Sequence, residues 1–158
     1  MEACRAMSDP IEHLYTLHTN PFLFATTLRG FFEYSKPRQH SVLLSYLVLP
    51  IVLDQGNRDF LESARRTSNL RTMLTHRQLL TAIPQRLEDY REVTNDTLRY
   101  LISSNLLTVN GTQVQLGLSD ALDPVAPPGA VAAANKLAEF LNPFDVPTIY
   151  RLLGVMQL

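Results

Sequence analysis

The chain has 158 residues, a hydrophobic fraction of 46% and a formal net charge of -1 at pH 7. This length predicts one domain, residues 1–158, with a core large enough to fold without disulfides. The near-neutral charge argues against a dedicated nucleic-acid-binding protein, which is usually strongly basic. A single cysteine, Cys4, excludes an internal disulfide and predicts a reducing, cytoplasmic location. The longest apolar run, residues 42–53, is too short for a membrane-spanning helix.

Residues 8–74 are predicted to form a series of N-terminal helices. Helix starts are expected at Asp9 and Asn20, because each can cap a helix and is followed by proline, which fits the first turn. The second of these helices carries too many aromatic side chains for one narrow apolar stripe. We therefore expect some of them to contact a partner protein, together with a tyrosine near the end of the chain: Phe22, Phe24, Phe31 and Tyr150.

A strongly apolar helix is predicted to begin near His40 and to lie in the centre of the core, because its side chains are apolar nearly all round. Pro50 should kink this helix, and the segment that begins at Asp54 should end it. Two short helices are expected to follow, one from Asn57 and one capped by Ser68.

Residues 75–117 have the order helix, turn, helix and tight β-hairpin that is typical of a winged helix. Pro84 should break or kink the first helix. Thr94 can cap the second helix, and Asn105 is expected to end it in the left-handed conformation. The Asn-Gly pair at 110–111 predicts a hairpin whose two turn residues both have positive φ. The predicted fold is therefore mainly α, an α-helical domain with a winged-helix core and one short β-hairpin.

The composition changes after the hairpin. Residues 118–129 hold three prolines and little that could pack, so we predict a proline-rich linker. Residues 130–158 predict two C-terminal helices, the first over residues 130–141 and the second capped by Asp145. This apolar end of the chain should dock on the chain's own core or on a neighbouring subunit.

The sequence contains none of the standard spacings for a catalytic or metal site. It has no glycine-rich phosphate loop, no His-Glu-x-x-His motif, no cysteine pair and no aspartate-rich calcium loop. We therefore predict that the protein is not an enzyme and that it uses no metal or cofactor.

A cluster of arginines is the main positive feature of the sequence. Five of them lie within twenty residues: Arg58, Arg65, Arg66, Arg71 and Arg77. The pair Arg65 and Arg66 precedes Ser68 and Asn69 at a predicted helix start, where free backbone N–H groups also favour anions. These four residues, with Arg99, are candidate contacts for phosphate or for an acidic partner. The alternative interpretation is a solvated surface with ion pairs.

Recognition of duplex DNA is the alternative function for a winged helix. Recognition helices use Arg, Lys, Asn or Gln to contact base edges, and this helix offers Asn95 and Arg99 beside Asp96. The predicted hairpin, residues 108–115, carries no positive charge, although phosphate contacts supply most non-specific affinity. A winged-helix DNA-binding protein or transcription regulator therefore remains the alternative to a protein-docking module.

Several weak motifs occur in an order that resembles a known family. They are an Asn-Pro pair (residues 20–21) that opens an aromatic helix, SYLVLPIVL (residues 45–53), RTSNL (residues 66–70), TLRYLISSNLL (residues 97–107) and IYRLLGV (residues 149–155). Together they make nearly the whole chain similar to the middle component of bacterial three-component ABC systems.

This resemblance implies a small, non-catalytic adaptor subunit with two partners. One partner would be an ABC-type (Rad50/SMC-like) ATPase, which would hold the phosphate loop that this chain lacks. The other would be an effector-linked component, and the adaptor would bridge the two by protein–protein contacts. Such systems resemble conflict or anti-phage defence modules, and assembly with further copies of the chain is left open.

Overall fold

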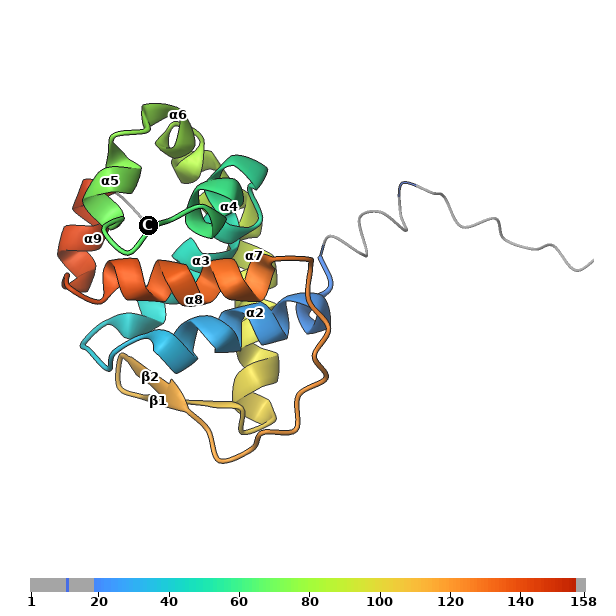
Figure 1. Cartoon of the computed structure of the whole chain (residues 1–158). Helices are drawn as coiled ribbons and strands as arrows, with labels where there is room; N and C mark the ends of the chain where they lie inside the picture. Colours follow the sequence, from blue (N-terminus) through green and yellow to red (C-terminus); the bar gives the residue numbers. More distant parts are fainter. Residues whose placement is uncertain (1–10, 12–18, 156–158) are drawn as a thin grey trace, which may run out of the picture.

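The computed structural model describes residues 11 and 19–155, so the helix start predicted at Asp9 lies outside the described residues. The described part is mainly helical with one two-stranded antiparallel hairpin, as predicted (Figure 1). Its elements in chain order are α2 (Pro21–Tyr34), the 3-10 helix η1 (Ser41–Leu44), α3 (Ser45–Val52), α4 (Gln55–Glu62), α5 (Leu70–Leu74), α6 (Arg77–Leu80), α7 (Ile83–Ser103), β1 (Leu107–Asn110), β2 (Gln113–Leu116), α8 (Ala130–Leu141) and α9 (Val146–Leu152).

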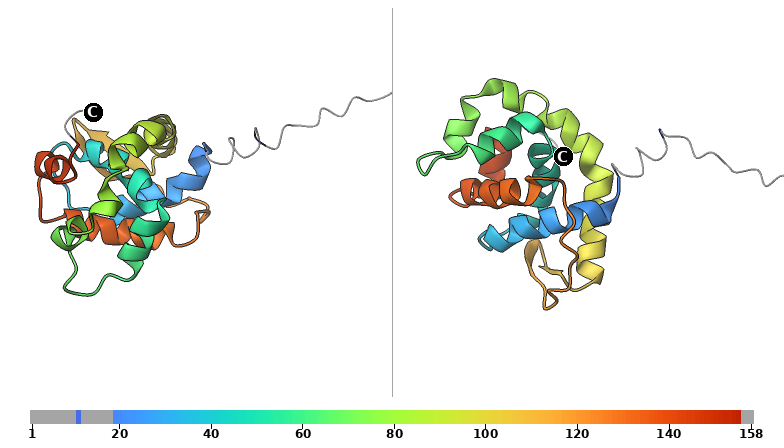
Figure 2. Two further views of the ribbon diagram at one scale, coloured as in Figure 1. Left: turned by 90° about the horizontal axis from the view of Figure 1, so that it is seen from above. Right: turned by 45° about the vertical axis from the view of Figure 1, so that its right-hand side comes forward.

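Helix α3 lies in the centre of the core. Its residues from Leu47 to Val52 are all buried, which confirms the predicted central helix. Helices α2 and α8 run side by side, and the long helix α7 packs against both α2 and α3 (Figure 1 and Figure 2). The hairpin lies at one end of the molecule and helices α4 to α6 lie at the other.

The helix predicted from His40 begins instead as the 3-10 turn η1 and continues as α3. His40 has a φ of 61°, in the left-handed region, so it precedes the helical residues. Pro50 lies inside α3 and is buried. Asp54 does more than end this helix, because its side chain accepts a hydrogen bond from the Asn57 N–H at 2.9 Å and so caps α4.

Helix α7 runs without a break from Ile83 to Ser103, so the N-cap predicted at Thr94 is wrong: Thr94 is buried in the middle of the helix. Pro84 lies in the first turn of α7, where its missing N–H would have no intrahelical partner in any case. No glycine or proline follows it before residue 103, and the buried positions keep helical spacing, so nothing interrupts the helix. The winged-helix core is therefore not confirmed.

The end of α7 agrees with the prediction for Asn105. This residue has a φ of 55°. Its N–H donates to the Ile102 carbonyl at 3.1 Å, and the Leu106 N–H donates to the Leu101 carbonyl at 2.9 Å. This is a Schellman motif, in which a left-handed residue lets the last carbonyl groups of a helix find donors. The motif turns the chain directly into β1.

The predicted hairpin is confirmed, with its turn shifted by one residue. The strands pair antiparallel, and the last pair before the turn is Asn110 opposite Gln113. The two turn residues are therefore Gly111 and Thr112, not Asn110 and Gly111. Of the two, only Gly111 has a positive φ, 63°, which fits a turn with glycine at its first central position.

The tip of the hairpin is docked on η1 and the residue before it. The Thr112 carbonyl accepts from the Val42 N–H at 3.1 Å, and the Thr112 hydroxyl accepts from the His40 N–H at 3.1 Å. The buried Val114 N–H donates to the Ser41 hydroxyl at 2.8 Å. Because these bonds join the tip to the body of the protein, the hairpin is a part of the fold rather than a projecting wing.

The proline-rich residues 118–129 contain no helix or strand, as predicted, but they are tied to α2. The Arg29 guanidinium forms an ion pair with Asp120 at 2.8 Å. The Thr26 hydroxyl donates to the Asp123 carbonyl at 2.9 Å. This segment therefore packs along the helix and is not a free spacer.

The two C-terminal helices follow the prediction. Helix α8 spans residues 130–141, and Asp145 caps α9 by accepting from the Thr148 N–H at 3.0 Å. Hydrogen bonds from Thr148 lower the pKa of Asp145 below its ordinary value. The cap is therefore charged at neutral pH, and its contribution to stability is lost only as the pH falls through this lowered pKa.

Arg38 joins the loop after α2 to the end of α8. Its Nη1 donates to the carbonyls of Leu141 at 2.7 Å and Phe144 at 2.6 Å, and its Nη2 donates to the Asn142 side chain at 3.0 Å. Burial lowers the pKa of Arg38. The guanidinium satisfies carbonyl groups at a helix C-terminus, where the helix dipole also favours a cation.

Replacement of Arg38 by alanine should lower the free energy of unfolding by about 2–4 kcal/mol, because carbonyl groups at the end of α8 then lose a charged donor. Urea unfolding followed by circular dichroism measures this change. The control is Arg66→Ala, at an exposed arginine that forms no ion pair with a described residue, which should change stability by less than about 0.5 kcal/mol. Equal stabilities for the two variants would contradict a role for Arg38 in holding α8.

Candidate partner-binding surface

The candidate contacts at residues 65–69 lie in the loop before α5. Arg65 and Arg66 are exposed, whereas the side chains of Ser68 and Asn69 form hydrogen bonds with nearby backbone. The Ser68 hydroxyl accepts from the Arg65 N–H at 3.0 Å, and the Asn69 side chain accepts from the Thr72 N–H at 3.1 Å. Asn69, not Ser68, is therefore the N-cap of α5, and it occupies a backbone donor that could otherwise bind an anion. The side chains of Arg65 and Arg66 therefore remain as candidates for the predicted anion contact.

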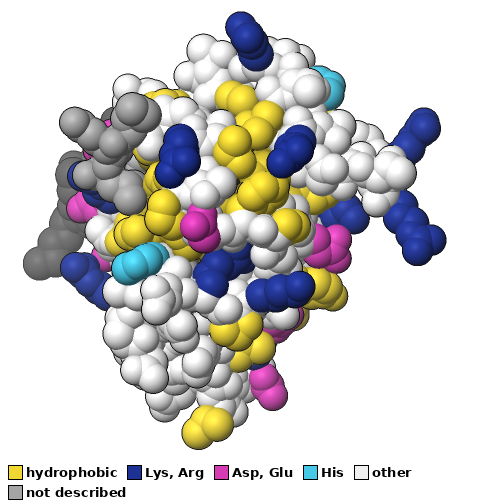
Figure 3. Space-filling view, turned by 90° about the vertical axis from the view of Figure 1, so that its left-hand side faces the viewer, with side chains coloured by type: hydrophobic (Ala, Val, Ile, Leu, Met, Phe, Trp, Pro, Cys, Tyr) yellow, Lys and Arg dark blue, Asp and Glu magenta, His cyan; other side chains and the backbone are white. Residues whose placement is uncertain are grey.

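Seven arginines of the described chain form no ion pair with a described acidic group, and four of these lie within residues 65–77. Ion pairs within the chain engage four other arginines: Arg29, Arg86, Arg91 and Arg99. Besides Arg38, Arg58 and Arg151, the arginines that form no ion pair with a described residue are exposed and make up a set that we call the arginine surface: Arg65, Arg66, Arg71 and Arg77. Residues 63–87 contain no Asp or Glu, so these four lie in a stretch of sequence without acidic residues. On the face seen in Figure 3, hydrophobic side chains form a strip with Lys and Arg side chains on both sides.

The residues predicted to contact DNA are engaged within the chain. Arg99 is exposed but pairs with Asp96 at 3.1 Å. The Asn95 side chain accepts a hydrogen bond from the Tyr46 hydroxyl at 2.6 Å. Since the hairpin tip is also docked on η1, the described residues present no projecting wing beside a free pair of base-reading side chains. Duplex recognition therefore gains no support from the fold.

Three of the four candidates for an apolar interface belong to the chain's own core. Phe24, Phe31 and Tyr150 are buried, and the Tyr150 hydroxyl donates to a carbonyl of η1 at 2.6 Å, so burial raises the pKa of Tyr150. The prediction is wrong for these three. Helices α3, α7 and α8 all pack on α2 and bury Phe24 and Phe31, and α9 packs on η1 and buries Tyr150. Phe22 is 60% exposed, and its ring lies edge-to-face on Tyr100 with the ring centroids 4.7 Å apart.

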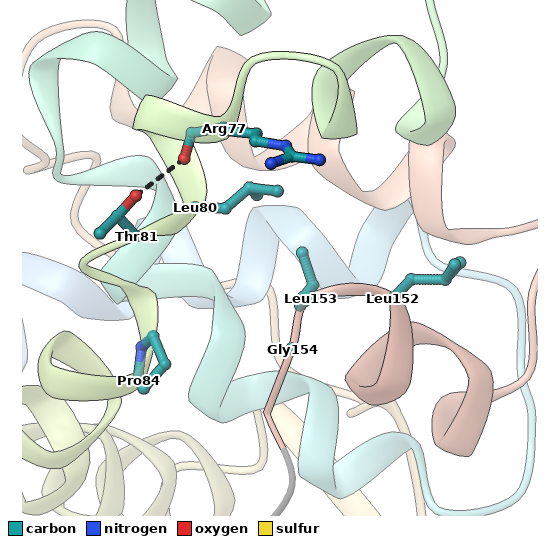
Figure 4. Close-up of a pocket in the computed structure, with 7 residues that line it drawn as sticks. All are labelled: Arg77, Leu80, Thr81, Pro84, Leu152, Leu153 and Gly154. Atoms are coloured by element: carbon teal, nitrogen blue, oxygen red, sulfur yellow. Dashed lines mark hydrogen bonds between the residues drawn. The ribbon is translucent and has the colours of Figure 1, made fainter.

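A groove opens beside Arg77, between the α6–α7 junction and the end of α9 (Figure 4). Its volume is about 290 Å³. Besides Arg77, Thr81 and Gly154, its lining consists of apolar side chains: Leu80, Pro84, Leu152 and Leu153. Because Arg77 belongs both to this lining and to the arginine surface, the groove combines an apolar floor with a positively charged rim.

The groove could not be found from the sequence, because residues 77–84 and residues 152–154 form its two sides. One local signal existed. Helix α9 holds more apolar side chains than one stripe can bury, and the surplus residue, Leu152, is 37% exposed in the structure. A second cavity of about 230 Å³ lies beside Tyr46 and Asn95, whose side chains are hydrogen-bonded to each other.

Residues 11 and 19–155 contain neither a candidate metal site nor a candidate membrane-spanning helix. No group of three or more His, Cys, Asp or Glu in this part of the chain is placed to hold a metal ion. No helix in it is both long and apolar enough to cross a membrane. The shifted pKa values of Arg38, Asp145 and Tyr150 arise from a helix end, a helix cap and core burial, which are structural roles.

The family model described as ABC-three component (ABC-3C) system Middle Component 3 matches residues 8–157. The chain therefore belongs to this family of middle components, which confirms the resemblance in its sequence motifs. Searches of curated proteins and of solved structures give no significant match. Membership in a multi-component ABC system implies that the protein has partners within that system.

Proposed function

We propose that the protein is a non-catalytic adaptor that bridges the ATPase and the effector-linked component of its three-component ABC system. The observation that carries this proposal is the family match over residues 8–157. The surface of the chain supports it, because arginines without an ion pair to a described residue and exposed apolar side chains are groups that a partner protein can cover.

The exposed groups suit a chain with two neighbours. Phe22 lies at the start of α2, whereas the arginine surface lies on α5, α6 and the loop before them, at a separate part of the molecule (Figure 1). Two partners could therefore be held at the same time without competing for one surface. In this proposal the ABC-type (Rad50/SMC-like) ATPase supplies ATP hydrolysis, since this sequence has no glycine-rich phosphate loop. The complete system acts in the bacterial cytoplasm as an anti-phage defence.

Co-purification tests the proposal. The affinity-tagged chain is expressed together with the ABC-type ATPase and the effector-linked component encoded beside it, and the eluate is resolved by size-exclusion chromatography. We expect each neighbour to be retained by the tagged chain and to co-elute with it, while the tag alone retains neither. A chain that elutes as a free monomer and retains neither neighbour would contradict the adaptor function.

A further inference from the structure

We propose that the groove beside Arg77 binds an acidic, amphipathic segment of one of the other two components of the system. The proposal rests on the adaptor function, and it adds the surface and the chemistry of the contact. Its basis is the position of a positively charged rim directly next to an apolar floor in which Pro84 and Leu152 are exposed.

The shape of the groove suits an apolar side chain of a protein better than a small molecule. Its volume of about 290 Å³ is at the lower limit of small-molecule pockets, about 300–1,000 Å³, and Figure 4 shows it open between its two sides. The polar side chain within it is already used, because the Thr81 hydroxyl donates to the Arg77 carbonyl at 3.0 Å. Leu80, Leu152 and Pro84 remain to contact an aliphatic or aromatic side chain.

Both sides of the groove are fixed by the local structure. On one side, Pro84 lies in the first turn of α7 and presents its ring without a free N–H. On the other side, Gly154 has a φ of 74°, and its N–H donates to the Arg151 carbonyl at 3.1 Å, while the Val155 N–H donates to the Tyr150 carbonyl at 3.0 Å. This Schellman motif ends α9 and sets the position of the groove wall. A preformed wall reduces the ordering cost of binding.

The charge at the rim selects an acidic occupant. The Arg77 side chain extends above Leu80 along the groove (Figure 4) and forms no ion pair with a described residue. Arg71 adds positive charge on α5, which packs against α6, and residues 63–87 hold no Asp or Glu. Since the net charge of the whole chain is -1, this positive potential is local.

A phosphate group or a nucleic acid would be a poorer fit than an acidic peptide. Phosphate sites use converging backbone N–H groups and polar side chains, whereas the floor of this groove is made of leucine and proline side chains. A segment that carries Asp or Glu on either side of a Leu, Ile or Phe residue would satisfy both parts of the groove. Charged groups at such a rim speed association, and the buried apolar anchor slows dissociation.

Binding kinetics of four variants test the proposal. The full-length chain is immobilised for biolayer interferometry, and each of the other two components is the analyte at several salt concentrations. The groove variants are Arg77→Glu and Leu152→Ser. The matched controls are Arg91→Glu, which makes the same charge change on α7, and Leu118→Ser, which changes a fully exposed leucine outside the groove. All four positions are exposed, and circular dichroism checks that each variant is folded.

For the component that binds, we expect Arg77→Glu to weaken affinity about tenfold, mainly through slower association, and to reduce its dependence on salt. Leu152→Ser should weaken affinity about fivefold, mainly through faster dissociation. Both controls should stay within about twofold of the unmodified chain, because neither touches the groove.

The possible failures are distinguishable. If the unmodified chain binds neither component, the adaptor function and the groove proposal both fail. If it binds and both groove variants bind equally well, the groove proposal alone fails. Duplex DNA binding that is lost in Arg77→Glu would assign the surface to nucleic acid. Self-association that is lost in the same variant, measured by light scattering, would assign it to a second copy of the chain, and either result would overturn the acidic-segment proposal.

Discussion

Replacement of Phe31 by alanine is expected to lower the free energy of unfolding by about 3–5 kcal/mol, the usual cost of removing a fully buried phenylalanine ring. The exposed fraction of Phe31 is 0%, and its ring packs edge-to-face on Phe32 with the centroids 5.2 Å apart. The side chain belongs to the main core cluster, which is built from α2, α3, α7 and α8 together. Urea unfolding of the full chain, followed by circular dichroism, measures the change.

The matched control is Phe22→Ala, on the same helix. Phe22 is 60% exposed and contacts Tyr100 at the surface, so its removal should cost about 1 kcal/mol or less. The two variants together test which phenylalanine of α2 lies in the core. The sequence predicted that both contact a partner, whereas the structure buries Phe31. A Phe31→Ala protein as stable as Phe22→Ala would contradict the position of α2 in the core.

Replacement of Gly117 by alanine is expected to cost about 3 kcal/mol or more, at the upper end of overpacking effects. A Cβ atom at this position would overlap the Asn105 carbonyl group and would lie 2.9 Å from the carbonyl carbon of Leu106. The neighbouring backbone cannot easily move away, because the Gly117 N–H donates to the Leu106 carbonyl and the Ser119 N–H donates to the Asn105 carbonyl, both at 3.0 Å. Thermal unfolding followed by circular dichroism measures the loss of stability.

Gly111→Ala is the control for Gly117→Ala, because it separates conformational strain from steric overlap. Gly111 has a φ of 63°, and a Cβ there would meet no atom within 4 Å. Alanine at this position should therefore cost only the strain of the left-handed backbone, about 1–2 kcal/mol. Equal or smaller effects at Gly117 would show that the chain after β2 does not pass as close to the end of α7 as the structure places it.

Features set by a few neighbouring residues could be predicted from the sequence. Asn20 caps α2 by accepting from the Phe22 N–H at 3.0 Å, and Asp145 caps α9, since each cap depends only on a side chain and the next turn of backbone. Asn105 ends α7 for the same local reason. The errors at this level are small shifts: Asn69 caps α5 in place of Ser68, and the hairpin turn moves by one residue.

Features that depend on packing between distant residues could not be predicted in this way. Thr94 looks like a helix cap in the sequence, but the surrounding core buries it inside α7, and no local breaker forces the helix to end. The predicted wing has the right strands, yet its docking on η1 depends on Ser41 and Val42, which lie about seventy residues earlier. Arg38 gave no local signal, because its partners are carbonyl groups beyond residue 140.

The candidate site shows the same division. The arginine cluster was visible in the sequence, and the structure leaves Arg65, Arg66, Arg71 and Arg77 without ion pairs to described residues. Arg99 instead forms an ion pair with Asp96 on the same helix. The groove beside Arg77 required the meeting of α6, α7 and α9, which only the folded chain brings together.

The central claim is that this middle component joins its two partners. Its most direct test is the mass of the complexes formed by the purified ATPase and effector-linked component, measured by size-exclusion chromatography with light scattering, with and without this chain. The account predicts a particle that contains all three proteins when the chain is present and separate ATPase and effector peaks when it is omitted. Co-elution of the ATPase and the effector-linked component to the same extent without the chain would contradict a bridging function.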